Sequence, residues 1–329
     1  MCLKKAGRRP WIGENIIFGI SHILCKHFQI PKSIKFQTIA LILCNKINIK
    51  NIIVVLNKID LFKGNIDEEI KTTRKFFEST SFGNSIPIFA VSAKDKIGFE
   101  ELKNGILETV NSLKIERHNE GNIIIPIDHH FPIKGIGAIL TGTILNGTLK
   151  LNQNLEILPV QTSGRVKSIQ IFHHNVDSAK AGDRVGINIK GVDLKKIYRG
   201  CYATNDPNSF DYCHILEVKV NNNKLFKPKT NFGTQVHVTL GMHTVVGSLY
   251  PYYNLGNKKI QTVATNKDEG FKAILRFHEK VLIRKESNLM LVSRLDLPPT
   301  TLRILGSAEL LKIHKLPPLF YKYKIKNTT

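Results

Sequence analysis

The sequence has few cysteines, and their spacing gives no basis for pairing them. The five cysteines among 329 residues are odd in number, and no two form a C-x-x-C pair: Cys2, Cys25, Cys44, Cys201 and Cys213. This pattern excludes a disulfide framework and a cysteine-based zinc site, and it favours a reducing compartment. The adjacent histidines at 129–130 and 173–174 lack a cysteine or carboxylate set at metal-binding spacing, so we expect no metal site.

The sequence also lacks a long apolar run. Residues 11–30 are apolar in part and follow paired basic residues at 4–5 and 8–9, as in a signal peptide. However, polar residues interrupt the stretch at Glu14, Asn15, His22, Lys26 and His27. A membrane-spanning helix needs about 20 apolar residues with few or no charges. We therefore expect neither a signal peptide nor a membrane partner.

Acidic residues are scarce relative to basic ones. The chain has 26 Asp and Glu against 48 Lys and Arg, which gives a formal net charge of +22. Such a charge suits a polyanionic partner such as RNA. A composition biased towards Lys, Asn and Ile throughout the chain would give the same number, so charge alone leaves both interpretations open.

The first third of the sequence alternates between strand and helix patterns. Residues 36–60 predict a helix and then a strand, whose apolar run at 52–56 is typical of a buried parallel strand. A polar helix at 67–77, a strand at 87–91 and an amphipathic helix at 99–113 follow. This order predicts half of a doubly wound α/β domain, of the kind found in P-loop GTPases.

After about residue 120 the pattern becomes entirely β. Short strands alternate with Gly, Asn and Asp turns at residues 123–127, 137–144, 154–158, 164–172 and 184–189. Such spacing predicts an antiparallel barrel. A second β-rich stretch runs from 213 to about 313, after an apparent linker at 203–212, and a basic tail follows that we expect to lead out of the domain.

Two polar motifs follow the predicted strands of the α/β half. Asn57-Lys58-Ile59-Asp60 comes directly after the strand at 52–56, and Ser92-Ala93-Lys94 comes directly after the strand at 87–91. Open α/β sheets bind their ligands at these carboxyl ends of strands. One such motif alone could be a solvated loop, but two in order, each after a strand, point to a nucleotide base.

The chemistry of these residues fits guanine. The Asp60 carboxylate can accept from the ring N–H and the exocyclic amine together, and the Asn57 amide can donate and accept at the base edge. The aliphatic stems of Lys58 and Lys94 can lie on the two faces of the base. The Ala93 backbone N–H can donate to the base oxygen, which would reject adenine.

No residues that hold phosphates accompany this guanine-reading set. The sequence contains no G-x-x-x-x-G-K-[S/T] run, whose backbone amides and lysine would bind the phosphates. The two D-x-x-G matches, at 95–98 and 183–186, lie downstream of Asn57 and are better interpreted as turns. We therefore expect this chain alone to bind GTP poorly and not to hydrolyse it, as an incomplete chain or a misjoined gene product would.

The barrel region resembles a known family. The run I-I-P-I-D-H-H-F-P-I-K-G-I-G-A-I-L-T-G-T-I-L-N-G at 124–147 is similar to the second domain of the elongation factor Tu superfamily, and the resemblance continues through 165–172, 181–186 and 199–200. Asp128-His129 and Gly182-Asp183-Arg184 resemble its selenocysteine-specific branch, and the chain as a whole resembles the eukaryotic selenocysteine-specific factor. Residues 233–249 and 273–297 resemble the third domain. The resemblance covers about residues 35–325.

This resemblance implies a cytoplasmic translational GTPase that delivers selenocysteyl-tRNA to the ribosome at recoded stop codons. The implied partners also include the selenocysteine insertion machinery on the mRNA, and the implied cofactors are GTP and Mg²⁺, although ligands for Mg²⁺ are absent from this sequence. The resemblance further implies that Asp128, His129 and Arg184 surround the selenocysteyl group. An Asp128–Arg184 pair could equally be a plain structural salt bridge.

The expected organisation has five parts: an unmatched segment at 1–34, the carboxyl-terminal half of a GTPase domain at 35–118, two β-barrels at 119–204 and 213–315, and a basic tail at 316–329. Two other functions stay open. The barrels could form an RNA-binding module without GTPase activity, or the chain could be another Tu-like or initiation-type carrier of tRNA. The combination of Asp128, His129 and Arg184 argues against the second.

Overall fold

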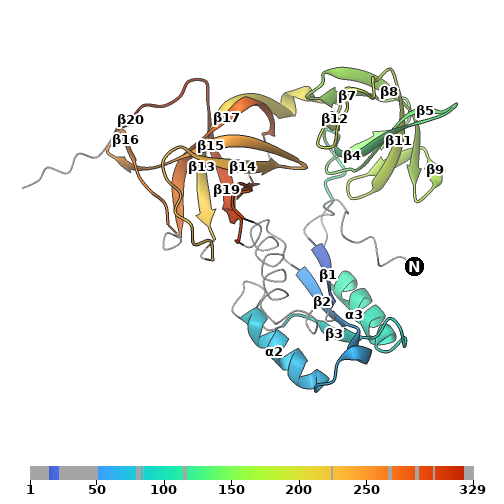
Figure 1. Ribbon diagram of the computed structural model, residues 1–329. Coiled ribbons are helices and arrows are strands. Elements are labelled where there is room, and N and C mark those ends of the chain that lie inside the picture. The colour runs from blue at the N-terminus through green and yellow to red at the C-terminus, as the bar shows by residue number, and fades with distance from the viewer. Residues whose placement is uncertain are drawn as a thin grey trace, which may run out of the picture. The chain divides into compact units, whose positions relative to one another are not determined.

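The computed structural model describes residues 15–21, 51–78, 83, 85–113, 117–223, 225–265, 269–285, 289–298 and 301–321. The chain divides into one unit at residues 11–116 and another that contains residues 117–329 (Figure 1). The first unit is the α/β part and the second holds the two barrels, which confirms the predicted fold class. The helix predicted before the strand at 52–56 lies outside the described residues.

A parallel sheet of three strands forms the centre of the first unit. The strand order is β1 (Asn15–Ser21), β2 (Asn51–Asn57) and β3 (Ile88–Val91), with β2 in the middle. The apolar run from Ile52 to Leu56 is buried throughout, as expected for a parallel strand that is covered on both faces. The strand β1 lies within residues 1–34, a segment unmatched at the level of sequence.

Two helices cover this sheet. Leu102 and Ile106 of α3 (Phe99–Ser112) pack on Ile53 and Val55 of β2. Figure 1 shows α2 (Ile66–Glu78) on the opposite side of the strands. The α2 helix begins with Asp67, Glu68 and Glu69, which suit the positive end of the helix dipole. The loops that carry the two polar motifs begin at the carboxyl ends of β2 and β3.

Residues 124–204 form the first barrel. Its strands follow one another in the order β11-β5-β4-β12-β7-β8-β9, and β11 also pairs with β8, which closes the ring. Alternate residues fill the interior, as Ile125 and Ile127 of β4 show. The bounds are β4 (Ile124–Ile133), β5 (Gly137–Thr143), β7 (Asn154–Leu158), β8 (Thr162–Ile171), β9 (His174–Val176), β11 (Arg184–Lys190) and β12 (Tyr202–Thr204), with β6 (Thr148–Lys150) and β10 (Ser178–Lys180) forming a separate pair.

The second barrel follows the same principle. Its order is β14-β18-β19-β13-β17-β15-β16-β20, and a β14–β15 pairing closes it. Leu216 and Val218 of β13 point into its core, so Glu217 between them faces outward. The bounds are β13 (Phe210–Asn222), β14 (Thr234–Leu240), β15 (His243–Leu255), β16 (Lys258–Gln261), β17 (Gly270–Arg284), β18 (Leu289–Ser293), β19 (Ile304–His314) and β20 (Phe320–Tyr321).

The structure differs from the sequence expectations at both ends of this second barrel. The expected linker at 203–212 contains the end of β12, a short 3-10 helix (Pro207–Ser209) and the start of β13. The expected tail does not leave the domain directly after residue 315. Phe320 and Tyr321 instead pair in parallel with β16, because Phe320 packs against the rings of Phe232 and Tyr250.

No helix among the described residues is long and apolar enough to cross a membrane.

Candidate functional site

The two polar motifs of the α/β unit meet at one edge of its sheet. The strands β2 and β3 are neighbours, and Asn57 at the end of β2 is in register with Val91 at the end of β3. The residues that follow, Lys58 and Ser92, therefore leave the sheet side by side. This is the position at which an open parallel sheet binds a ligand.

Hydrogen bonds join the two loops. The Ser92 hydroxyl lies 2.8 Å from Asp60 Oδ1, and its side chain is fully buried. The Asn57 Oδ1 atom accepts from the Lys58 backbone N–H at 2.7 Å and is 3.4 Å from the Ala93 backbone N. Asn57 and Ser92 thus fix the loops, and Ser92 holds Asp60 through Oδ1, while no group in the described part of the chain bonds to Asp60 Oδ2.

The backbone around these residues takes unusual conformations. Lys58 has φ of 70°, in the left-handed region that few non-glycine residues adopt. Gly98 closes the second loop with φ of +74°, and a Cβ there would lie 2.2 Å from the Ala90 carbonyl oxygen. The loop after β3 consequently needs glycine at residue 98. Lys94 is exposed and Lys58 is half-buried, so both side chains can reach a ligand at this edge.

A second cluster lies on the first barrel around Asp128. The register of β4 against β5 shifts between Ile127 and His129, which places Asp128 at a β-bulge. Bulges re-aim side chains, and the Asp128 side chain is turned inward with only 1% of its surface exposed. Gly142 lies opposite Ile127, and a Cβ there would come within 2.3 Å of the Pro126 carbonyl oxygen.

Three side chains surround the Asp128 carboxylate. Arg184 Nη1 donates to Oδ2, Thr141 Oγ1 donates to Oδ1 at 2.5 Å, and His129 Nδ1 lies 3.2 Å from Oδ1. Burial alone would raise the pKa of Asp128, but the hydrogen bonds from Arg184 and Thr141 and the charge of Arg184 outweigh it. The pKa of Asp128 therefore lies below its ordinary value of 3.8, and the group is an anion at neutral pH.

The donors above this carboxylate remain partly accessible. The side chain of Arg184 is 39% exposed and that of His129 is 61% exposed. Arg184 has five N–H donors, so pairing with Asp128 leaves others free for a ligand. The structure thus brings together Asp128, His129 and Arg184, which the sequence had grouped.

Thr141 was missed at the sequence level. It lies opposite His129 in the β4–β5 hairpin. Only the register of this hairpin could have indicated it, and the bulge at Asp128 makes that register hard to count from sequence.

Comparison with known families matches three stretches of the chain. Residues 25–112 match the model described as elongation factor Tu GTP binding domain, and residues 137–204 match elongation factor Tu domain 2. Residues 212–314 match archaeal selenocysteine-specific elongation factor, domain III. The first match begins ten residues before the boundary expected at residue 35.

Curated relatives and solved structures agree with these matches. The chain is 38% identical over 267 residues to a selenocysteine-specific elongation factor of Methanocaldococcus jannaschii, covering 79% of this chain and 56% of the relative. It is 33% identical over 232 residues to the mouse selenocysteine-specific elongation factor, covering 67% and 39%. The chain thus spans about half the length of these relatives.

Among solved structures, the translation elongation factor SelB from Methanococcus maripaludis, in complex with the GTP analogue GppNHp, has a TM-score of 0.79 at 32% identity. The similarity covers 92% of this chain and 66% of that one.

Proposed function

We infer that the chain belongs to the elongation factor Tu superfamily, among the selenocysteine-specific elongation factors, and from this premise we propose that it takes part in GTP-dependent delivery of selenocysteyl-tRNA to the ribosome at recoded stop codons. The observation that carries the proposal is the Asp128 cluster, in which partly exposed Arg184 and His129 lie over a buried carboxylate. The relatives include an archaeal and a mouse protein, and we propose that the chain is a member of the eukaryotic branch.

The proposed pocket distinguishes amino acids by charge. A selenol is more acidic than a thiol, so selenocysteine is largely an anion at neutral pH, whereas serine, its precursor on the same tRNA, stays neutral. Shape alone would separate two such similar side chains by only about 1–3 kcal/mol. Arg184 supplies a permanent, planar cation with several donors, and His129 adds a further donor or a proton.

Asp128 has a positioning role in this proposal. Its carboxylate fixes the direction of the Arg184 guanidinium and limits repulsion between Arg184 and a protonated His129. It also reduces the net charge of the pocket, so a second anion has to compete for the remaining donors of Arg184.

GTP is the nucleotide that the sheet edge fits. Asp60 and Asn57 would read the base edge, Lys58 and Lys94 would cover its faces, and Ser92 and Ala93 would hold the loops in place. GTP would supply the terminal phosphoanhydride bond whose hydrolysis accompanies release of the tRNA. The described residues include no glycine-rich phosphate cradle and no Mg²⁺ ligands, so we propose that this chain alone binds the base weakly and does not hydrolyse GTP.

The remaining assignments follow from the family. We propose the ribosome and the selenocysteine insertion machinery on the mRNA as partners, and the cytoplasm as location. The +22 charge suits such RNA-rich partners.

Replacement of Arg184 tests the amino-acid pocket. Binding of selenocysteyl-tRNA and seryl-tRNA would be compared for a chain extended with the GTPase segment of the Methanocaldococcus jannaschii relative, and for its Arg184→Ala variant. We expect the variant to lose at least tenfold more affinity for selenocysteyl-tRNA than for seryl-tRNA. Arg165→Ala, at an exposed arginine of the same barrel, is the matched control and should affect both tRNAs equally.

Folding has to be checked in the same experiment, because Arg184→Ala leaves the Asp128 carboxylate buried with fewer donors. Circular dichroism and the unfolding midpoint would show whether the barrel persists, and Arg184→Lys, which keeps the charge, gives a milder variant. Equal losses for the two tRNAs in a folded variant would show that Arg184 is a structural ion-pair partner and nothing more.

A further inference from the structure

The outer face of the second barrel carries a groove that the proposed function does not use. Its volume is about 520 Å³, and Ile215 and Phe277 contribute its apolar part. The polar side chains that line it are His214, Ser248, Tyr250, Arg276 and His278. They come from three neighbouring strands, β13, β15 and β17.

The strand register places Arg276 at the centre of this set. Arg276 on β17 is directly opposite Ile215 on β13 and Ser248 on β15. Tyr250 lies two residues beyond Ser248 on the same face of β15, and His278 also lines the groove, where the pairing of β17 with β13 is irregular. His214 joins them because the register of β13 shifts between Cys213 and Ile215. The groove is thus built from a cation surrounded by N–H and O–H donors.

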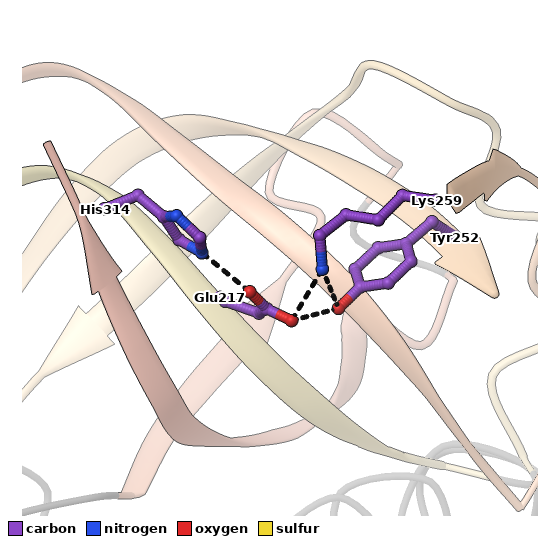
Figure 2. A network of polar contacts seen from close by, with 4 residues as sticks. All are labelled: Glu217, Tyr252, Lys259 and His314. Atoms are coloured by element: carbon purple, nitrogen blue, oxygen red, sulfur yellow. Dashed lines mark hydrogen bonds and ion pairs between the residues drawn. The ribbon is translucent and has the colours of Figure 1, made fainter. Parts of the chain in front are cut away.

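No described carboxylate pairs with Arg276, although an acid lies on the same face. Figure 2 shows that Glu217 is surrounded by donors: Lys259 Nζ lies 2.8 Å from Oε1, His314 Nε2 lies 2.6 Å from Oε2, and the Tyr252 hydroxyl also donates to Oε1. Burial would raise the pKa of Glu217, but these three donors lower it to about 2. Its charge is therefore already compensated, and Arg276 keeps its own.

Two lysines extend the positive charge along the same face. Lys219 on β13 and Lys272 on β17 are directly opposite one another, and both are exposed. Like charges directly opposite one another destabilise a sheet, and Glu309 of β19, which lies opposite Lys219 on its other side, offsets part of this charge. Lys272 is four residues from Arg276, or about 14 Å along the strand at about 3.4 Å per residue. The field of this face therefore favours a negatively charged ligand.

The donor geometry selects among anions. A planar guanidinium makes two parallel hydrogen bonds to an oxyanion, and the histidine and hydroxyl donors reach the same space from both neighbouring strands. Donors on several sides suit a tetrahedral group with several oxygens better than a flat carboxylate. The volume exceeds that of a single inorganic anion and leaves room for the organic part of an ester. We propose that this groove, the Arg276 groove, binds a phosphate ester.

Nuclear magnetic resonance titration of the full chain tests the proposal. The probes are inorganic phosphate, uridine monophosphate and a ten-nucleotide single-stranded RNA, each at constant ionic strength set with chloride. We expect saturable shifts of the backbone amides of Arg276, Ser248 and His214. Arg276→Gln should weaken binding at least fivefold, whereas Arg165→Gln, at an exposed arginine of the other barrel, should leave it unchanged.

The three probes distinguish the source of the phosphate. Tighter binding of uridine monophosphate than of the RNA would indicate a small ester. Tighter binding of the RNA would indicate a nucleic-acid backbone; the slope of log affinity against log salt concentration should then decrease by about one phosphate contact in Arg276→Gln. Both results support a phosphate-ester site. Shifts that spread over the surface without saturating, or equal weakening by Arg165→Gln, would overturn it. His278→Gln should reproduce part of the loss, and unchanged unfolding midpoints would exclude an effect on folding.

Discussion

Replacement of Glu217 by Gln should destabilise the second barrel, and more so at neutral than at acid pH. Glu217 accepts hydrogen bonds from Tyr252, Lys259 and His314, which lie on three other strands (Figure 2). Gln keeps the size of the side chain but removes the charge and offers one acceptor oxygen in place of two. Lys259 and His314, whose side chains are only 20% and 16% exposed, would then lack an anionic partner.

The magnitude follows from the pKa. The pKa of Glu217 is lowered from its ordinary value of 4.5 to about 2, and the Glu217 side chain is 14% exposed. At about 1.4 kcal/mol for each pH unit, this lowering corresponds to roughly 3 kcal/mol of stability in favour of the charged form. Because the folded-state pKa lies below the unfolded one, this stability is fully present above about pH 4.5 and is lost as the pH falls towards 2.

Urea unfolding measures the effect. We expect Glu217→Gln to lower the free energy of unfolding by about 2–3 kcal/mol at pH 7, and the difference from the unsubstituted chain to shrink between pH 5 and pH 2. Methyl signals of Val218 and Leu275 report on this barrel alone. Glu279→Gln, at an exposed acid of β17, is the matched control. A pH-independent difference, or an equal loss in the control, would refute the electrostatic argument.

Three further predictions concern the other sites. Thr141→Val should raise the pKa of Asp128, because a hydroxyl donor to the carboxylate is lost. Thr141→Ser keeps the hydroxyl and should keep the low pKa. A carbon-detected titration of the Asp128 carboxyl measures the pKa in both variants. Asp60→Asn should shift any weak nucleotide preference from guanine towards xanthine. A competition assay with a fluorescent nucleotide measures the preference, and the absence of that shift would show that Asp60 does not recognise the base. Phe320→Ala should destabilise the second barrel by about 1–3 kcal/mol in the same urea assay, because it removes the ring that packs on Tyr250 and Phe232.

The local elements could be predicted because their signals are local. The apolar run at 52–56 has the length and composition of a buried strand, and it forms β2 within one residue at each end. The amphipathic pattern from residue 99 likewise gives α3. The polar motifs after β2 and β3 could be placed together, because neighbouring parallel strands end at the same edge of a sheet.

What could not be predicted depends on pairing between distant residues. The strand β1 lies in a stretch interrupted by polar residues, and its partner β2 begins 30 residues after β1 ends. The return of Phe320 to the barrel depends on an aromatic cluster assembled from two other segments. Glu217 and His314 are 97 residues apart and come together only because β13 and β19 are neighbours. Sequence periodicity carries no information about such pairings.

Each barrel contains a largely buried carboxylate that is bound by three donors, and the two clusters differ in how accessible those donors are. Each has a carboxylate at an irregularity of the strand register, Asp128 beside the shift in β4 and Glu217 beside the shift between β13 and β19. Each carboxylate collects three donors, and in both cases they outweigh the effect of burial and lower its pKa.

The exposure of the donors separates the two roles. Lys259 and His314 are only 20% and 16% exposed, so the Glu217 network is closed to a ligand and ties strands together. Arg184 and His129 are 39% and 61% exposed, so the Asp128 cluster presents its donors to the surface. A carboxylate that merely stabilised the first barrel would gain more from buried partners, because screening weakens exposed pairs. The accessible donors around Asp128 are therefore in keeping with the proposal that this cluster binds a ligand, which the Arg184→Ala comparison tests.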